Sequence, residues 1–212
     1  MECRRSPGIS VSLEIAKANL RHNFPGHFAM AVVLMVLTPV LFGTTELREQ
    51  ACAVPLEMFF SLIGIVLLTP VFTPEQNPQI AETVAAKYIS CTHVYFIRTI
   101  YSILAILGLT CIFVGYLGSQ GCEITVRLVM GTVADGIFLG ALGFISGAVS
   151  GNTAVSYMVP MVYYGINYAA GNRLGRFYLF SMTRGEYGAA PWLLGSGIIL
   201  LAAGILIKWK KG

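Results

Sequence analysis

The chain has 212 residues with a formal net charge of +4; 56% of them are hydrophobic and 11% charged, and the mean hydropathy is +0.72. Soluble domains carry roughly 25% charged residues, so this composition excludes a soluble enzyme, a nucleic-acid-binding protein and a disordered chain. A membrane-spanning helix takes about 20 apolar residues, which leaves room for about six spans.

Six almost uncharged apolar runs follow one another, each near the length of a membrane span. They lack the alternation of membrane β-barrel strands. The sequence therefore predicts an all-α membrane protein, with residues 1–212 forming one transmembrane domain after a cytoplasmic interfacial segment, 1–26. The predicted spans are 28–43, 55–72, 94–117, 128–150, 154–170 and 191–207.

Lys and Arg residues set the predicted orientation, because they are enriched in cytoplasmic loops. With the N-terminus inside, the inner side receives nine of them and the outer side five. This bias predicts a multi-pass protein of the cell (plasma) membrane with both termini cytoplasmic. The segment Asn172–Ala189 fits this orientation least well, since its three arginines would face outward.

Two polar segments have helical periodicity. Ser10–Arg21 places apolar and charged residues on different faces, which favours a helix on the inner membrane surface over a plain cytoplasmic tail helix. Between the second and third spans, Asn77 and Pro78 form a helix start. Apolar residues then recur every four positions, which predicts a short amphipathic helix parallel to the membrane; the alternative is a connecting loop.

Sequence motifs for catalysis and metal binding are missing. No phosphate-binding loop, C-x-x-C or H-E-x-x-H pattern occurs, and the three histidines lie at predicted span boundaries. The chain is therefore expected not to be an enzyme, with no catalytic residue, no metal site and no cofactor of its own.

Asp135 is the one acid well inside a predicted span, about 12 Å beyond Arg127 at the rise of a helix. Such a charge indicates function, or it is satisfied locally by Thr132 or a hydroxyl on another span. A glycine face follows it, which indicates close packing between helices or, alternatively, a pathway or dimer surface. It consists of Gly136, Gly140, Gly143, Gly147 and Gly151.

Two further sets of residues are candidates. Tyr157, Tyr164 and Tyr168 share a face of the fifth predicted span, where they either pack or line a pathway. Cys52 and Cys122 both fall in short predicted outer loops, where an oxidising exterior permits a disulfide. The alternative is two free cysteines, because spacing does not fix geometry.

Residues Thr69–Ser90 (TPVFTPEQNPQIAETVAAKYIS), followed by Val94–Arg98 (VYFIR), resemble the corresponding region of ABC-transporter permeases of the type-2 exporter class. The six-span layout and the N-terminal helix are also similar to that family. The resemblance implies a coupling helix between spans two and three that docks on a separate ATPase. It also implies short re-entrant helices at Asn172–Ala189, which would accommodate the outer arginines. Its candidate ATPase-coupling residues are Glu75, Ile80, Glu82, Val84, Lys87 and Tyr88.

The implied partners are ABC ATPase subunits, which would bind ATP and Mg, a second permease chain, identical or related, and membrane lipid. The expected function is ATP-driven export of a hydrophobic or amphipathic substrate such as a peptide, antibiotic or lipid-like molecule. Two alternatives stay open. One is an ion-coupled secondary transporter using Asp135, and the other is a non-transporting sensor or assembly subunit.

Overall fold

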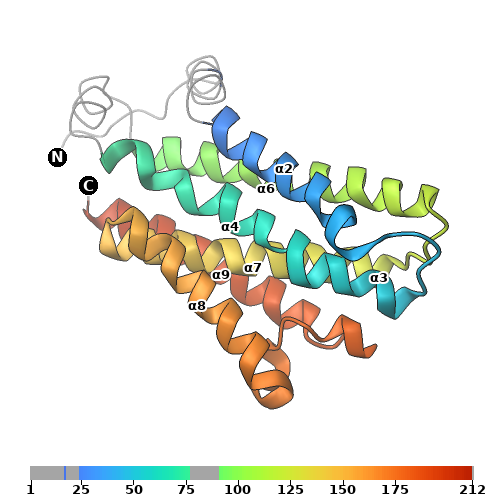
Figure 1. The fold of residues 1–212 in the computed structure, drawn as a ribbon. Coiled ribbons are helices and arrows are strands. Elements are labelled where there is room, and N and C mark those ends of the chain that lie inside the picture. The colour runs from blue at the N-terminus through green and yellow to red at the C-terminus, as the bar shows by residue number, and fades with distance from the viewer. Residues whose placement is uncertain (1–16, 18–23, 77–90, 212) are drawn as a thin grey trace.

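The fold comes from a computed structural model, which describes the backbone of residues 17, 24–76 and 91–211. Within these ranges every regular element is a helix, so the predicted all-α class is confirmed. The elements shown in Figure 1 are α2 (Phe24–Phe42), α3 (Glu49–Pro55), the π-helical turn η1 (Leu56–Phe60), α4 (Leu62–Leu68), the 3-10 helix η2 (Thr69–Gln76), α6 (Cys91–Ser119), α7 (Val126–Ser150), α8 (Thr153–Ala170), the 3-10 helices η3 (Gly171–Phe177) and η4 (Met182–Arg184), and α9 (Ala190–Lys211).

Five stretches of the described chain are long and apolar enough to cross a membrane: Phe24–Phe42, Glu49–Thr73, His93–Ser119, Val126–Ser150 and Ala190–Lys210. These stretches support a multi-pass membrane protein. The fifth predicted span, 154–170, forms α8 but is not among them. Its tyrosines and Asn167 lower the hydropathy of an 18-residue helix that is otherwise apolar.

The second spanning stretch begins earlier than the predicted residue 55. It runs without a gap through α3, η1, α4 and into η2, starting at Glu49. The predicted span 55–72 has Glu57 near its start, whereas the helical stretch begins eight residues before Glu57. The residue lies about 12 Å along the helix from Glu49 and is 1% exposed. The charge did not mark the boundary because backbone N–H groups of another segment satisfy it inside the bundle.

Helix α7 forms the centre of the bundle and packs against α4, α8 and α9. Glycines allow the closest approach: a Cβ built on Gly64 of α4 would lie 1.8 Å from the carbonyl oxygen of Gly136. Gly140 is also crowded, since its Cβ would meet the Gly64 carbonyl oxygen at 2.5 Å. The interpretation of the glycine face as a packing surface within the chain is confirmed for its first four members, whereas a Cβ on Gly151 would meet nothing within 4 Å.

The α7–α8 turn has a local sequence cause. Gly151 ends α7 with a left-handed backbone conformation (φ 65°), which glycine adopts without strain. Asn152 then caps α8, because its side chain accepts the Ala154 N–H at 2.8 Å. These two residues send α8 back along the bundle.

The bundle has two distinct ends. At the first, called the η2 end, the starts of α2 and α6 meet η2 and the end of α9. Phe24 packs edge-on against Tyr101, and Lys208 lies over the ring of Phe72.

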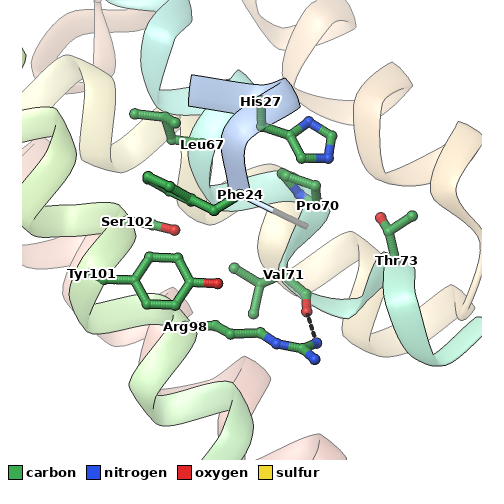
Figure 2. A pocket seen from close by; sticks show the side chains of 9 residues that line it. All are labelled: Phe24, His27, Leu67, Pro70, Val71, Thr73, Arg98, Tyr101 and Ser102. Atoms are coloured by element: carbon green, nitrogen blue, oxygen red, sulfur yellow. Dashed lines mark hydrogen bonds between the residues drawn. The ribbon is translucent and has the colours of Figure 1, made fainter. Parts of the chain in front are cut away.

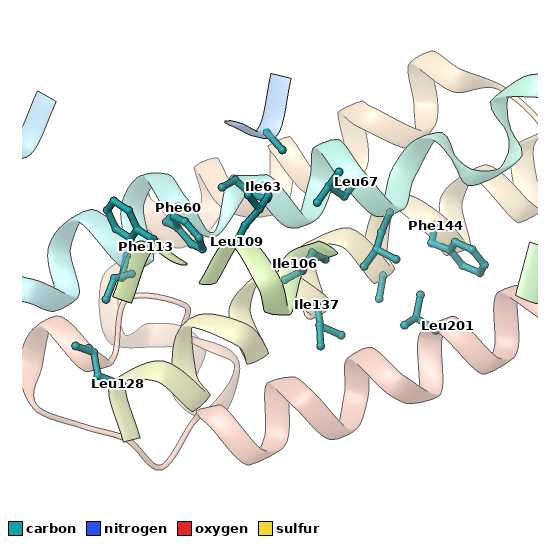
Figure 3. Close-up of a cluster of buried hydrophobic side chains, with 14 of the residues drawn as sticks. Phe60, Ile63, Leu67, Ile106, Leu109, Phe113, Leu128, Ile137, Phe144 and Leu201 are labelled. Carbon is teal, nitrogen blue, oxygen red and sulfur yellow. The ribbon is translucent and has the colours of Figure 1, made fainter. Parts of the chain in front are cut away.

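The opposite end, called the η4 end, holds the loop between α2 and α3 and the loop between α6 and α7. Backbone hydrogen bonds join Glu46 to Gln120 and Glu123 to Leu47 there. Between the two ends lies a core of buried side chains from η1, α4, α6, α7 and α9 (Figure 3).

Candidate functional site

The carboxylate of Glu57 is the centre of the most polar buried site in the described chain. Its Oε1 accepts the Met182 N–H at 2.5 Å, and its Oε2 accepts the Thr183 N–H at 2.9 Å and the Thr183 hydroxyl. Three donors from η4 thus converge on one side chain of η1. Glu57 lies in a π-helical turn, an irregularity that is frequent at functional sites.

The chain between η3 and η4 folds back into the bundle, and residues 178–182 are all buried. We call residues 178–183 the returning segment. Asn167 of α8 holds it, since the Asn167 Oδ1 accepts the Leu179 N–H at 3.0 Å while its Nδ2 donates to the Tyr163 carbonyl at 3.1 Å. The Tyr163 hydroxyl also donates to the Phe177 carbonyl at 2.6 Å.

Tyr187 ties the chain beyond η4 to α3. Its hydroxyl donates to the Glu49 Oε1 at 2.7 Å. Burial and the hydrogen bond to Glu49 raise the pKa of Tyr187 to about 12. The phenol therefore stays protonated, and stays a donor, throughout the physiological pH range.

Asp135 lies beside this site. It is 2% exposed, and its Oδ2 has no hydrogen-bond partner among the described residues. Its carboxyl group is close enough to that of Glu57 for the two to interact electrostatically. Thr132, the expected local partner, instead donates its hydroxyl to the Leu128 carbonyl at 2.9 Å.

The three candidate tyrosines of α8 have different surroundings. The Tyr164 hydroxyl donates to the Met58 carbonyl at 2.5 Å, which joins α8 to η1. Tyr157 packs, partly buried, against the core. Tyr168 is 67% exposed and meets the ring of Phe180 edge-on. Two of the three therefore pack within the bundle, and Tyr168 presents most of its surface outward.

Cys52 and Cys122 are brought together at the η4 end. Both are buried free thiols, and the two side chains interact directly. Each also donates to a carbonyl of the loop before α3, Cys52 to Leu47 and Cys122 to Thr44. The structure places the two thiols near each other, and the bridge itself stays a prediction.

At the η2 end, Arg98 of α6 is buried and its Nη1 donates to the Val71 carbonyl of η2 at 2.9 Å. The contact borders a cavity of about 120 Å³ between the starts of α2 and α6 and η2. Figure 2 shows Arg98 reaching Val71, with His27 and Thr73 further along the lining. This guanidinium joins the second and third spanning stretches on either side of residues 77–90.

The predicted ATPase-coupling residues fall mostly outside the described chain. Glu75 is the last residue but one of η2. Residues 77–90, and with them Ile80, Glu82, Val84, Lys87 and Tyr88, lie outside the described residues. Their predicted roles stay predictions. The same holds for the helix expected at Ser10–Arg21.

Sequence reasoning missed several residues of the site, namely Glu57, Asn167, Thr183 and Tyr187. The sequence did contain a signal for Asn167, which is a lone carboxamide in an apolar run. Buried amides are nearly always hydrogen-bonded, so a partner for it could have been expected. Nothing local marked Thr183 or Tyr187, because their partners are more than 100 residues away in the chain.

Metal binding has no support in the described part of the chain, where no group of three potential ligands gathers. No protein-family model, no curated protein and no solved structure matches the chain.

Proposed function

We propose that the chain is the permease subunit of an ATP-driven exporter, with six membrane crossings and both termini in the cytoplasm. Besides the five spanning stretches, α8 is the remaining crossing, the fifth in chain order. It runs from the η2 end, where Ser156 packs against Gly147, to the η4 end, where Asn167 holds the returning segment. In this proposal the η2 end is cytoplasmic.

The observation that carries the proposal is the buried contact between Arg98 and Val71. A separate ATPase must move the permease from the cytoplasmic side, through the segment that joins the second and third spans. Arg98 connects η2 to α6 just beyond that segment. A push on residues 77–90 would therefore tilt both spans together instead of bending one of them.

The η4 end supports the same proposal. An exporter needs an outer barrier that opens when the spans tilt. The returning segment is held there by Glu57 of η1 and Asn167 of α8, and Tyr187 ties the chain just beyond it to α3. Movement of α4 would be transmitted to it through η1, which continues into α4. The cargo is expected to be hydrophobic or amphipathic.

Val84→Arg tests the coupling step. The substitution places a charge on the apolar face of the predicted coupling helix, so we expect normal membrane insertion, retained ATPase activity in the partner and loss of export. Gln79→Arg is the matched control. It lies outside the apolar face of the predicted coupling helix, so the variant should export normally. Normal export by Val84→Arg, or no soluble ATPase co-purifying with the chain, would contradict the proposal.

An ion-coupled secondary transporter is the second candidate, favoured by the buried, unpartnered carboxylate oxygen of Asp135. It differs in its energy source. Transport driven by a proton or sodium gradient in vesicles without ATP, and lost in Asp135→Asn, would favour it over the exporter.

A further inference from the structure

Met182 contacts Glu57 on one side and, on the other, the surface of α7 one turn before Asp135. The N–H of Met182 donates to Glu57, and the sulfur of Met182 lies over Gly131, where a Cβ would be 2.1 Å from it. Gly131 is one helical turn before Asp135 on the same face of α7. The two carboxyl groups are thus placed together in the interior, beneath the returning segment.

The hydrogen bonding of the two acids is unequal. Glu57 accepts from three donors, which is the environment of an ionised carboxylate. The Oδ2 of Asp135 has no donor among the described residues although the side chain is 98% buried. Burying a charge without partners is very unfavourable, and a neighbouring negative charge adds to that cost.

The described elements packed against α7 offer no positive charge to balance an ionised Asp135. Helix α4 carries no titratable residue, α9 carries its basic residues only in its last turn, η1 presents Glu57, and α8 presents the phenol of Tyr163. Four basic groups of the described chain lie against other partners: Arg184 over Tyr178, Arg176 over Trp192, Lys208 over Phe72, and Arg127 beside Glu49 and Tyr187.

We propose that Asp135 and Glu57 form an intramembrane binding site for one proton, carried by Asp135 while Glu57 stays ionised and holds the returning segment. Binding transfers one proton from hydronium to the Asp135 carboxylate and leaves water. With the proton bound, the pair carries a single negative charge, which the three donors on Glu57 stabilise. Loss of the proton adds a second negative charge and weakens the hold on residues 178–183.

The proposal does not depend on the export function, and its test needs no transport assay. Asp135 is the only aspartate in the 212-residue chain. An isotope label on the side-chain carboxyl carbon of aspartate therefore reports on this residue alone. Infrared difference spectra of labelled and unlabelled full-length protein in lipid nanodiscs distinguish a neutral carboxylic acid from an ionised carboxylate.

We expect the label to shift a neutral carboxylic acid band at neutral pH, in sodium and in choline buffer alike. If the label shifts only carboxylate bands, Asp135 is charged and the proposal is wrong. If the neutral band occurs in choline and is replaced by carboxylate bands when sodium is added, the site holds a metal cation, and the proton assignment is again wrong. The wild-type protein suffices for these outcomes.

Glu57→Gln tests the pairing. Removing the neighbouring negative charge makes Asp135 easier to ionise, so the neutral band should disappear at a lower pH than in the wild type. Glu123→Gln, on an exposed acid of the α6–α7 loop, is the matched control and should leave that midpoint unchanged. An unchanged midpoint in Glu57→Gln would contradict a shared site.

Discussion

Glu57 and Thr183 are 126 positions apart in the chain, yet the carboxylate of one accepts both the backbone N–H and the hydroxyl of the other. This pair fixes the tip of the returning segment to the second spanning stretch. It also explains how an acid is kept inside a predicted membrane helix, because charge-assisted hydrogen bonds offset part of its desolvation.

Glu57→Gln should loosen the returning segment. Hydrogen bonds to a charged group contribute about 1.5–3 kcal/mol each, and the carboxamide replaces only part of them. We expect amide hydrogen exchange at Met182 and Thr183 to be faster by about 30–100-fold, since 1.4 kcal/mol corresponds to a factor of ten. Mass spectrometry of peptides spanning 178–186 measures this, and exchange equal to that of Glu123→Gln would contradict the role.

Asn167→Leu should destabilise the same segment from the α8 side. The replacement has a similar volume but leaves the buried Leu179 N–H without its acceptor, which costs about 1–3 kcal/mol. A lower midpoint of thermal unfolding in detergent is the expected result. Ser119→Ala removes an exposed hydrogen bond and is the control. Equal midpoints for the two variants would show that the Asn167 contact adds no stability.

Gly64→Ala should separate α4 from α7. The new methyl group would lie 1.8 Å from the Gly136 carbonyl oxygen, so the backbones must move apart. We expect a loss of at least about 1–3 kcal/mol, the usual cost of overpacking. Gly108→Ala in α6 meets nothing within 4 Å and should be neutral or slightly stabilising. The yield of folded monomer in detergent measures the effect. A yield reduced in Gly108→Ala but not in Gly64→Ala would contradict the close contact between α4 and α7.

The Cys52–Cys122 bridge is expected in protein isolated without reductant, because the thiols interact directly and the η4 end is the proposed outer end. A bridge hides both thiols from a maleimide after denaturation, leaving them reactive only once the protein is reduced. Cys111→Ser removes an exposed cysteine of α6 and so simplifies the count of maleimide-labelled cysteines. Labelling of Cys52 and Cys122 in unreduced, denatured protein would reject the bridge.

Much of the fold was predictable because long apolar runs have few options in lipid: every backbone group must be satisfied within a helix. Five of the six predicted runs meet the criteria for spanning stretches, and the glycine face of α7 packs as expected. The second stretch starts at Glu49, six residues before the predicted start, and Glu57 lies within it. Whether α8 crosses the membrane stays a prediction.

The candidate site was predictable only in part. Asp135 was recognisable as a lone acid in an apolar run, and the polar segment 172–189 as irregular. The pairing of that segment with Glu57 and Asn167 was not recognisable, because a polar side chain inside a span does not indicate which distant donor will reach it. Likewise, spacing did not show that Cys52 and Cys122 are neighbours.

The sequence by itself determined the helical class, the apolar character and the position of Asp135, since these follow from composition and from the length of a bilayer span. Only the tertiary structure decided that the second stretch begins at Glu49, that Glu57 is buried, and that residues 178–183 return to meet it. The reason is that burial of a charge is decided by its hydrogen-bond partners, and here those partners come from the far end of the chain.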